Sequence, residues 1–215
     1  MKIYYWSLLL ICALFSCENT EQKKPTAAKP ISSTEQNATV ETGNRIFWES
    51  LKNLCGKSFE GKLIKGPEVN DFEGKKLVMH VLFCDDEQIL IPFNVGDNRS
   101  RTWVFTYKND RITLKHDHRK EDGSDDKVTM YGGTTPNAGL PGIAMFPADD
   151  ETQSLIAYAA TNVWWVTIDE NEYTYNLKRI GNEGQFTISF DLNTEINTPK
   201  ASWGWENFIE ANLSN

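Results

Sequence analysis

Runs of alternating apolar and polar residues fill most of the chain after residue 57. The runs are rich in β-branched and aromatic residues, and clusters of Asp, Asn and Gly separate them, as in short β-strands joined by turns. Alternation is cleanest in the last run, where Phe186, Ile188 and Phe190 share one face. The pattern predicts strands over Ser58–Lys65, Lys75–Cys84, Gln88–Val95, Thr102–Lys108, Arg111–His118, Lys127–Tyr131, Asn162–Ile168, Tyr173–Ile180 and Gln185–Leu192.

Short connections between most of these runs indicate antiparallel neighbours, and no helical segments separate them as in a parallel sheet. The fold class predicted is therefore all-β. We expect an antiparallel meander that closes as a lipocalin-like or calycin-like barrel, because closure removes the exposed edges that a long meander would leave. A two-sheet sandwich is the alternative.

A helical pattern precedes the first strand. Phe47, Trp48, Leu51 and Leu54 recur at spacings of three to four residues, which predicts an amphipathic helix over residues 44–56. Asn44 is suited to cap its start and Gly56 to end it. One such helix cannot form a core alone, so we expect it to cover a side or an end of the barrel.

A Gly- and Pro-rich segment interrupts the strands between residues 132 and 160. We expect a long loop and then a short helix from Asp149 or Asp150, with Asp150 and Gln153 in the pattern of a capping box. The helix follows about the sixth strand. Two interpretations stay open: a lid over a cavity at the barrel end, or a plug that fills that end.

The N-terminus carries the pattern of a bacterial lipoprotein signal. A basic start is followed by an apolar run, and Leu14-Phe15-Ser16-Cys17 closes it. We expect residues 1–16 to be removed and Cys17 to be lipidated. The run is shorter than a permanent transmembrane helix requires, which disfavours a spanning anchor.

Residues 17–43 have no aromatic side chain and are rich in Thr, Glu, Lys and Pro, which predicts a lipidated, disordered tether before a single domain over residues 44–215. The membrane is therefore an expected partner, through acyl chains on Cys17. Glu18 stands where lipoproteins of the inner membrane often carry Asp. We therefore expect the cell envelope, and the outer rather than the inner membrane.

Charge and cysteines restrict the partners further. The formal net charge is −8, and an acidic protein repels nucleic-acid phosphates, so we expect no nucleic acid as a partner. We also expect the protein to be a monomer. Cys12 leaves with the signal and Cys17 takes the lipid. In an oxidising compartment the remaining pair, Cys55 and Cys84, is expected to form a disulfide; two separately buried thiols are the alternative.

Histidines give the strongest candidate for a site. His116 and His118 share one face with Ile112 and Leu114, so both imidazoles are expected on the inner face near the barrel mouth. Two imidazoles on one strand face can bind a divalent metal ion or a ligand. His80, in an apolar strand, could join them in an open metal site. The alternative is that all three are ordinary buried histidines.

Two arginines near a strand start form a second cluster. Arg99 and Arg101 stand beside Trp103, and guanidinium groups pair with carboxylates. We expect structural ion pairs with the turn that contains Glu121 and Asp122. The aromatic residues are expected to form the core, and some could line a cavity for a small apolar ligand.

No Gly-x-Ser-x-Gly elbow, P-loop, dinucleotide fingerprint or His-Glu-x-x-His motif occurs in the sequence, which disfavours an enzyme and leaves an activity without these signatures as an alternative. The segments FWESLKNLCGKSFEG, KKLVMHV, IPFNVGDNRSRTWV and LKHDHRKEDGSDDKVTMYGG resemble those of a family of exported bacterial proteins and lipoproteins without an assigned activity. The resemblance spans about residues 46–205. It implies export and a single domain, and it implies no catalytic residue.

Three functional hypotheses follow. The first is a lipid-anchored barrel that binds a small ligand, a metal or a cofactor near His116 and His118. The second is a structural or interaction lipoprotein whose barrel is fully packed. The third is a metal-dependent enzyme that uses His80, His116 and His118.

Overall fold

A computed structural model describes residues 41–66 and 71–208 of the 215-residue chain. The predicted signal peptide, Cys17 and most of the predicted tether lie outside the described residues. The described part contains one antiparallel sheet, and its strands follow the order β7-β6-β5-β4-β2-β1-β11-β10-β9-β8, with β3 paired to β4. The strands are β1 (Ser58–Lys65), β2 (Leu77–His80), β3 (Phe83–Cys84), β4 (Gln88–Val95), β5 (Asn98–Lys108), β6 (Arg111–His118), β7 (Tyr131–Thr134), β8 (Ile143–Pro147), β9 (Asn162–Ile168), β10 (Glu172–Arg179) and β11 (Gln185–Glu195).

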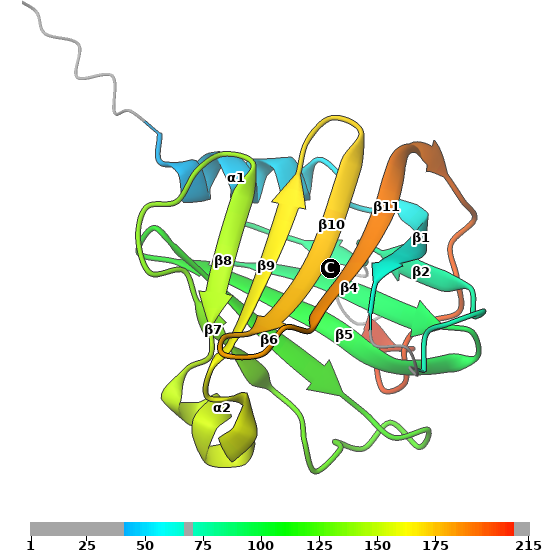
Figure 1. Cartoon of the computed structure of the whole chain (residues 1–215). Coiled ribbons are helices and arrows are strands. Elements are labelled where there is room, and N and C mark those ends of the chain that lie inside the picture. The colour runs from blue at the N-terminus through cyan, green and yellow to red at the C-terminus, as the bar shows by residue number, and fades with distance from the viewer. Residues whose placement is uncertain (1–40, 67–70, 209–215) are drawn as a thin grey trace, which may run out of the picture. The chain divides into compact units, whose positions relative to one another are not determined.

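The sheet curls into a nearly closed barrel of calycin-like type, as the sequence predicts (Figure 1). The two end strands, β7 and β8, meet at a seam where Gly133 bridges Ala148 and the amide of Asp149 donates to the carbonyl oxygen of Gly132 over 3.0 Å. A Cβ atom on Gly133 would lie 1.7 Å from the carbonyl oxygen of Pro147. The barrel therefore closes only because this position has no side chain.

Helix α1 (Gly43–Lys52) covers one end of the barrel, and Phe47, Trp48 and Leu51 are fully buried on its inner face. The expected boundaries of this helix are wrong. Thr42, not Asn44, caps the start, and Asn53, not Gly56, caps the end.

Asn44 is instead a buried residue inside the helix. Its Nδ2 donates to the carbonyl oxygens of Asp110 and Asn137 and to Oγ1 of Thr135. These contacts attach α1 to the barrel rim. They also supply the donor that the rim carbonyl groups of Asp110 and Asn137 require where they are buried.

The predicted disulfide is confirmed: Cys55 and Cys84 are bonded, with 6.1 Å between their Cα atoms. It ties the turn after α1 to β3. The strand expected over Lys75–Cys84 is divided, because the chain between β2 and β3 bonds elsewhere: Val81 donates to Lys57 and Leu82 to Leu90.

Residues 127–160 differ most from the expectation. The strand predicted over Lys127–Tyr131 is absent, and the segment expected as a loop contains β7 and β8. A short helix, α2 (Asp150–Leu155), and a 3₁₀ turn, η1 (Ala157–Ala159), then lie at the end of the barrel opposite α1 (Figure 1). The helix is capped by Asp149, whose Oδ1 accepts from the amide of Thr152; the proposed Asp150–Gln153 capping box does not form.

The segment after β11 packs outside the barrel on β5 and β6. Trp203 donates its amide to the carbonyl oxygen of Arg99, and Trp205 Nε1 donates to Oδ2 of Asp117 over 2.8 Å. This cover explains why Asp117 is buried on the outer face of its strand. Across the described part of the chain, no helix has the length and apolar character needed to cross a membrane.

Candidate functional site

A cavity of about 410 Å³ lies inside the barrel at its α2 end, and we call it the barrel cavity. Its wall combines residues of β4, β5, β6, β7, β9, β10 and β11 with Phe72, Val128 and residues of the segment 156–159 that follows α2. Eight of the lining residues are aromatic: Phe72, Phe93, Trp103, Tyr131, Tyr158, Trp164, Tyr175 and Phe186. Concave sites of this size and character are typical of small-molecule binding.

Three of the rings form a stacked row along one wall. Trp103 lies between Phe93, at 4.9 Å between ring centroids, and Tyr175, at 4.5 Å. Phe72 extends the row beside Phe93 and tilts against Phe186. Phe93 and Trp103 lie on the consecutive, paired strands β4 and β5, whereas Tyr175 lies on β10, so the curling of the sheet brings Tyr175 against Trp103.

His116 lies on the inner face of β6, as predicted, and both of its ring nitrogens have protein partners. Nδ1 lies 2.9 Å from the carbonyl oxygen of Tyr131, and Nε2 lies 2.7 Å from the hydroxyl of Tyr175. A carbonyl oxygen only accepts, so Nδ1 carries the proton and the Tyr175 hydroxyl donates to Nε2. Burial lowers the pKa of His116 to about 3, which keeps the ring neutral.

His118 also lines the cavity, two residues along the same strand face. Its Nε2 shares a hydrogen bond of 3.1 Å with the hydroxyl of Tyr131. Burial, followed by the nearby charge of Arg101, lowers the pKa of His118 to about 4. Burial also raises the pKa of Tyr131 to about 12, so this pair is neutral near pH 7.

His80 does not join the other two histidines, so the three-histidine centre, the third of the hypotheses, does not form among the described residues. His80 lies on β2, outside the cavity wall, where Nδ1 contacts Oγ of Ser58 at 2.9 Å and the carbonyl oxygen of Lys57. Desolvation lowers its pKa. Within residues 41–66 and 71–208, no three His, Cys, Asp or Glu side chains gather as a metal site would require.

The expected ion pairs of Arg99 and Arg101 with Glu121 and Asp122 are also wrong for the described residues. Arg99 donates to the carbonyl oxygen of Ala201 and lies 3.9 Å from Glu206 Oε1. Asp122 accepts from the amide and hydroxyl of Ser124 within its own turn. Arg101 lines the barrel cavity and does not contact the turn that contains Glu121 and Asp122 in the described part of the chain.

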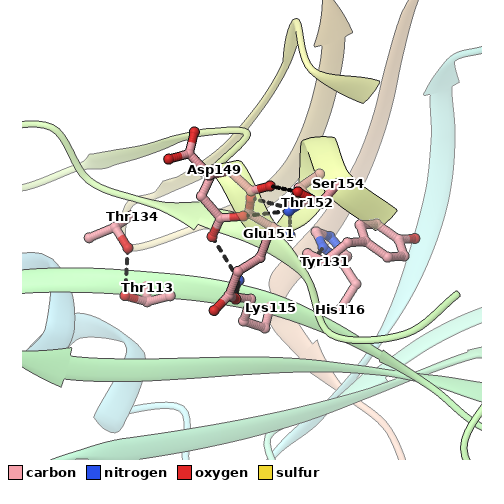
Figure 2. A network of polar contacts seen from close by, with 11 residues as sticks. Thr113, Lys115, His116, Tyr131, Thr134, Asp149, Glu151, Thr152 and Ser154 are labelled. Atoms are coloured by element: carbon pink, nitrogen blue, oxygen red, sulfur yellow. Dashed lines mark hydrogen bonds and ion pairs between the residues drawn. The ribbon is translucent and has the colours of Figure 1, made fainter. Parts of the chain in front are cut away.

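The α2 segment is firmly attached to the barrel wall beside His116 (Figure 2). Lys115 Nζ contacts Oδ2 of Asp149 and Oε2 of Glu151, each at 2.7 Å. Thr152 is fully buried and exchanges two hydrogen bonds with the backbone of Gly132. Ile156, Tyr158 and Ala159 then line the cavity, so the segment forms part of its rim and does not fill the barrel end.

The alternation of apolar and polar residues along β6 predicts that His116 and His118 face the barrel interior. The aromatic content of the sequence indicates several of the other wall residues. Sequence analysis misses Tyr131, Arg179 and the contributions of η1 as site residues. The sequence pattern predicts Tyr131 at the end of a strand over Lys127–Tyr131, whereas Tyr131 begins β7, and no local pattern reports that its backbone reaches His116.

Comparisons with protein-family models, curated proteins and solved structures find no match to this chain. The resemblance to exported proteins and lipoproteins therefore stays a prediction, and the site must be interpreted from its own geometry.

Proposed function

We propose that this domain is a binding module of the bacterial cell envelope whose barrel cavity holds a small, largely apolar ligand. The observation that carries the proposal is the open aromatic cavity under the α2–η1 rim. A barrel of about eight strands is just wide enough either to be filled by side chains or to hold one small ligand, and the sheet of the described residues has 11 strands. A cavity maintained among eight aromatic residues is best explained by a guest of matching polarity.

The alternative of a fully packed structural barrel expects no internal cavity, so the observed volume favours binding. A metal-dependent enzyme is the weaker alternative. A metal ion at His116 would have to displace Tyr131 or Tyr175 from a ring nitrogen, because both nitrogens already have partners. The polar groups of the wall are therefore better suited to orient a ligand than to hold a metal.

The experiment uses a neutral, apolar fluorescent probe, N-phenyl-1-naphthylamine, titrated into the purified full chain. Leu177 lines the cavity and is half-buried, so Leu177→Trp should fill part of the space and weaken probe binding at least tenfold. Leu192→Trp is the matched control, since Leu192 is half-buried against the core but does not line the cavity. Absence of probe binding to the unaltered chain, or equal binding by the two variants, would count against a cavity site.

Delivery to the envelope by a lipid on Cys17 is part of the same proposal. It is supported by the signal pattern in the sequence, and outer-membrane sorting is supported by Glu18. Cys17→Ser should abolish acylation, detectable by mass spectrometry of the mature chain, and release the protein from the membrane fraction. Retention of the variant in that fraction would contradict a lipid anchor, and separation of the two membranes tests the sorting.

A further inference from the structure

The barrel cavity is positively charged in an acidic protein. The chain has 30 acidic and 22 basic residues, yet its described cavity wall contains Arg101 and Arg179 and neither Asp nor Glu. Its buried ionisable groups, His116, His118, Tyr131 and Tyr175, are neutral near pH 7 because burial disfavours their charged forms. Among the described wall residues, the remaining charge is therefore that of the two guanidinium groups.

Arg179 already has partners at the rim. Its Nε donates to Oδ1 of Asn162 over 3.0 Å, and its guanidinium carbon lies 4.8 Å from the ring centroid of Tyr158, which is exposed. Arg179 thus braces the mouth of the cavity, with its charge close to solvent.

Arg101 lies deeper, on β5, and is half-buried. Its guanidinium carbon lies 5.4 Å from the ring centroid of Phe72, and among the described residues its side chain has one long hydrogen bond, 3.5 Å from Nη1 to Oγ of Ser100. In the described part of the chain, no carboxylate forms an ion pair with it. Asp71 acts on it only through space and is exposed.

A guanidinium group in an apolar wall loses hydration, and a carboxylate normally compensates this loss. Within the described cavity wall, the groups beside Arg101 are neutral: His118 is its cross-strand partner, and the Tyr131 hydroxyl lies beside His118. The fork of N–H donors on Arg101 matches the two oxygens of a carboxylate, and neither neutral neighbour would repel that anion.

We propose that the ligand of the barrel cavity is a small carboxylate with a flat apolar body, its carboxylate bound by Arg101 and its body lying against Trp103 and Phe93. This inference rests on the proposed function, since it names the chemical class of the guest. It predicts that Arg101 determines specificity for the head group and that the aromatic row determines affinity for the body.

The test compares three probes that share one body, 2-naphthoate, 2-naphthamide and 2-naphthylmethylamine, by calorimetry on the full chain. Charge-assisted hydrogen bonds of this kind change binding by about tenfold to a hundredfold. We expect naphthoate to bind at least tenfold more tightly than the amide, and the ammonium probe to bind most weakly. Arg101→Gln should remove the preference for naphthoate and leave the affinity for the amide within about threefold.

Arg99→Gln is the matched control, since Arg99 carries the same charge on the same strand but does not line the cavity. It should retain the preference for naphthoate. Equal affinities for naphthoate and the amide in the unaltered chain would overturn the carboxylate assignment and leave the binding function standing. Retained preference in Arg101→Gln would overturn the role of Arg101. If none of the three probes binds and the neutral fluorescent probe also fails, the proposed function falls, and the carboxylate inference falls with it.

Discussion

The ring nitrogen Nε2 of His116 accepts a hydrogen bond of 2.7 Å from the hydroxyl of Tyr175, which joins β6 to β10 across the barrel interior. Both side chains are buried, and the two residues are separated by 59 positions in the sequence. The Tyr131 carbonyl oxygen at Nδ1 fixes the tautomer of His116, and the Tyr175 contact braces the cavity between two strands that are not neighbours in the sheet.

Tyr175→Phe should destabilise the domain by about 1–3 kcal/mol, because it leaves Nε2 of His116 buried without a donor. Tyr173→Phe is a matched control two residues earlier on the same strand. The Tyr173 side chain is fully buried, and its hydroxyl has no hydrogen-bond partner among the described residues. Its removal should therefore be neutral or stabilising. Urea unfolding of the two variants measures the difference, and similar losses in both would show that the His116–Tyr175 bond contributes little.

Stability should fall as the pH drops below about 6.5. Burial lowers the pKa of His116 to about 3 and that of His118 to about 4, below the ordinary 6.5 of an unfolded histidine. Between these values the unfolded chain binds protons that the folded chain excludes. The contribution is complete above pH 6.5, and each histidine removes up to about 1.4 kcal/mol per pH unit as the pH falls.

His116→Gln isolates this effect, because glutamine cannot titrate. Between pH 6 and pH 4.5, the free energy of unfolding of the variant should depend on pH less steeply than that of the unaltered chain. The expected difference is about 1 kcal/mol per pH unit. Identical slopes would mean that His116 keeps an ordinary pKa in the folded state.

The seam between β7 and β8 should tolerate no side chain at Gly133. Gly133→Ala would place Cβ 1.7 Å from a backbone oxygen, so the strands must separate, at a cost of about 3 kcal/mol or more. Gly184→Ala is the control, since the added Cβ would meet its nearest neighbour, Asn182 Oδ1, at an ordinary 3.5 Å. Chemical unfolding should show a large loss in the first variant alone; equal stabilities would contradict closure at this seam.

The disulfide should contribute about 3–4 kcal/mol, since it links residues separated by 29 positions and restricts the unfolded chain. Replacing both cysteines, Cys55→Ser with Cys84→Ser, removes it without leaving a free thiol. Unaltered protein unfolded in the presence of a reductant should match this double variant. A loss below about 1 kcal/mol would show that the bond does not constrain the unfolded chain as expected.

Strand alternation predicts much of the barrel because one face of each strand is buried. Ile188 and Phe190, on the predicted inner face of β11, are fully buried. The same argument fails for β7, whose sequence Tyr-Gly-Gly-Thr has low strand propensity. Gly132 is required by the close approach of β6 and Gly133 by that of β8, and these are tertiary contacts that local patterns do not report.

The site is predictable to a similar extent. Alternation places His116 and His118 on the inner face, but their partners Tyr131 and Tyr175 come from other strands whose register is set by closure. The predicted ion pairs of Arg99 and Arg101 with Glu121 and Asp122 fail for the same reason, since tertiary contacts decide which groups meet. Arg99 meets Glu206 from the C-terminal segment, and Arg101 faces the cavity, so sequence proximity to an acidic turn is a poor guide.

The central claim is that the barrel cavity is a ligand site, and a crystal structure of the full chain grown with saturating N-phenyl-1-naphthylamine tests it most directly. The account predicts density for the probe inside the cavity, in van der Waals contact with Trp103, Trp164 and Tyr175. A cavity that contains only water at a probe concentration that saturates the fluorescence signal would contradict it.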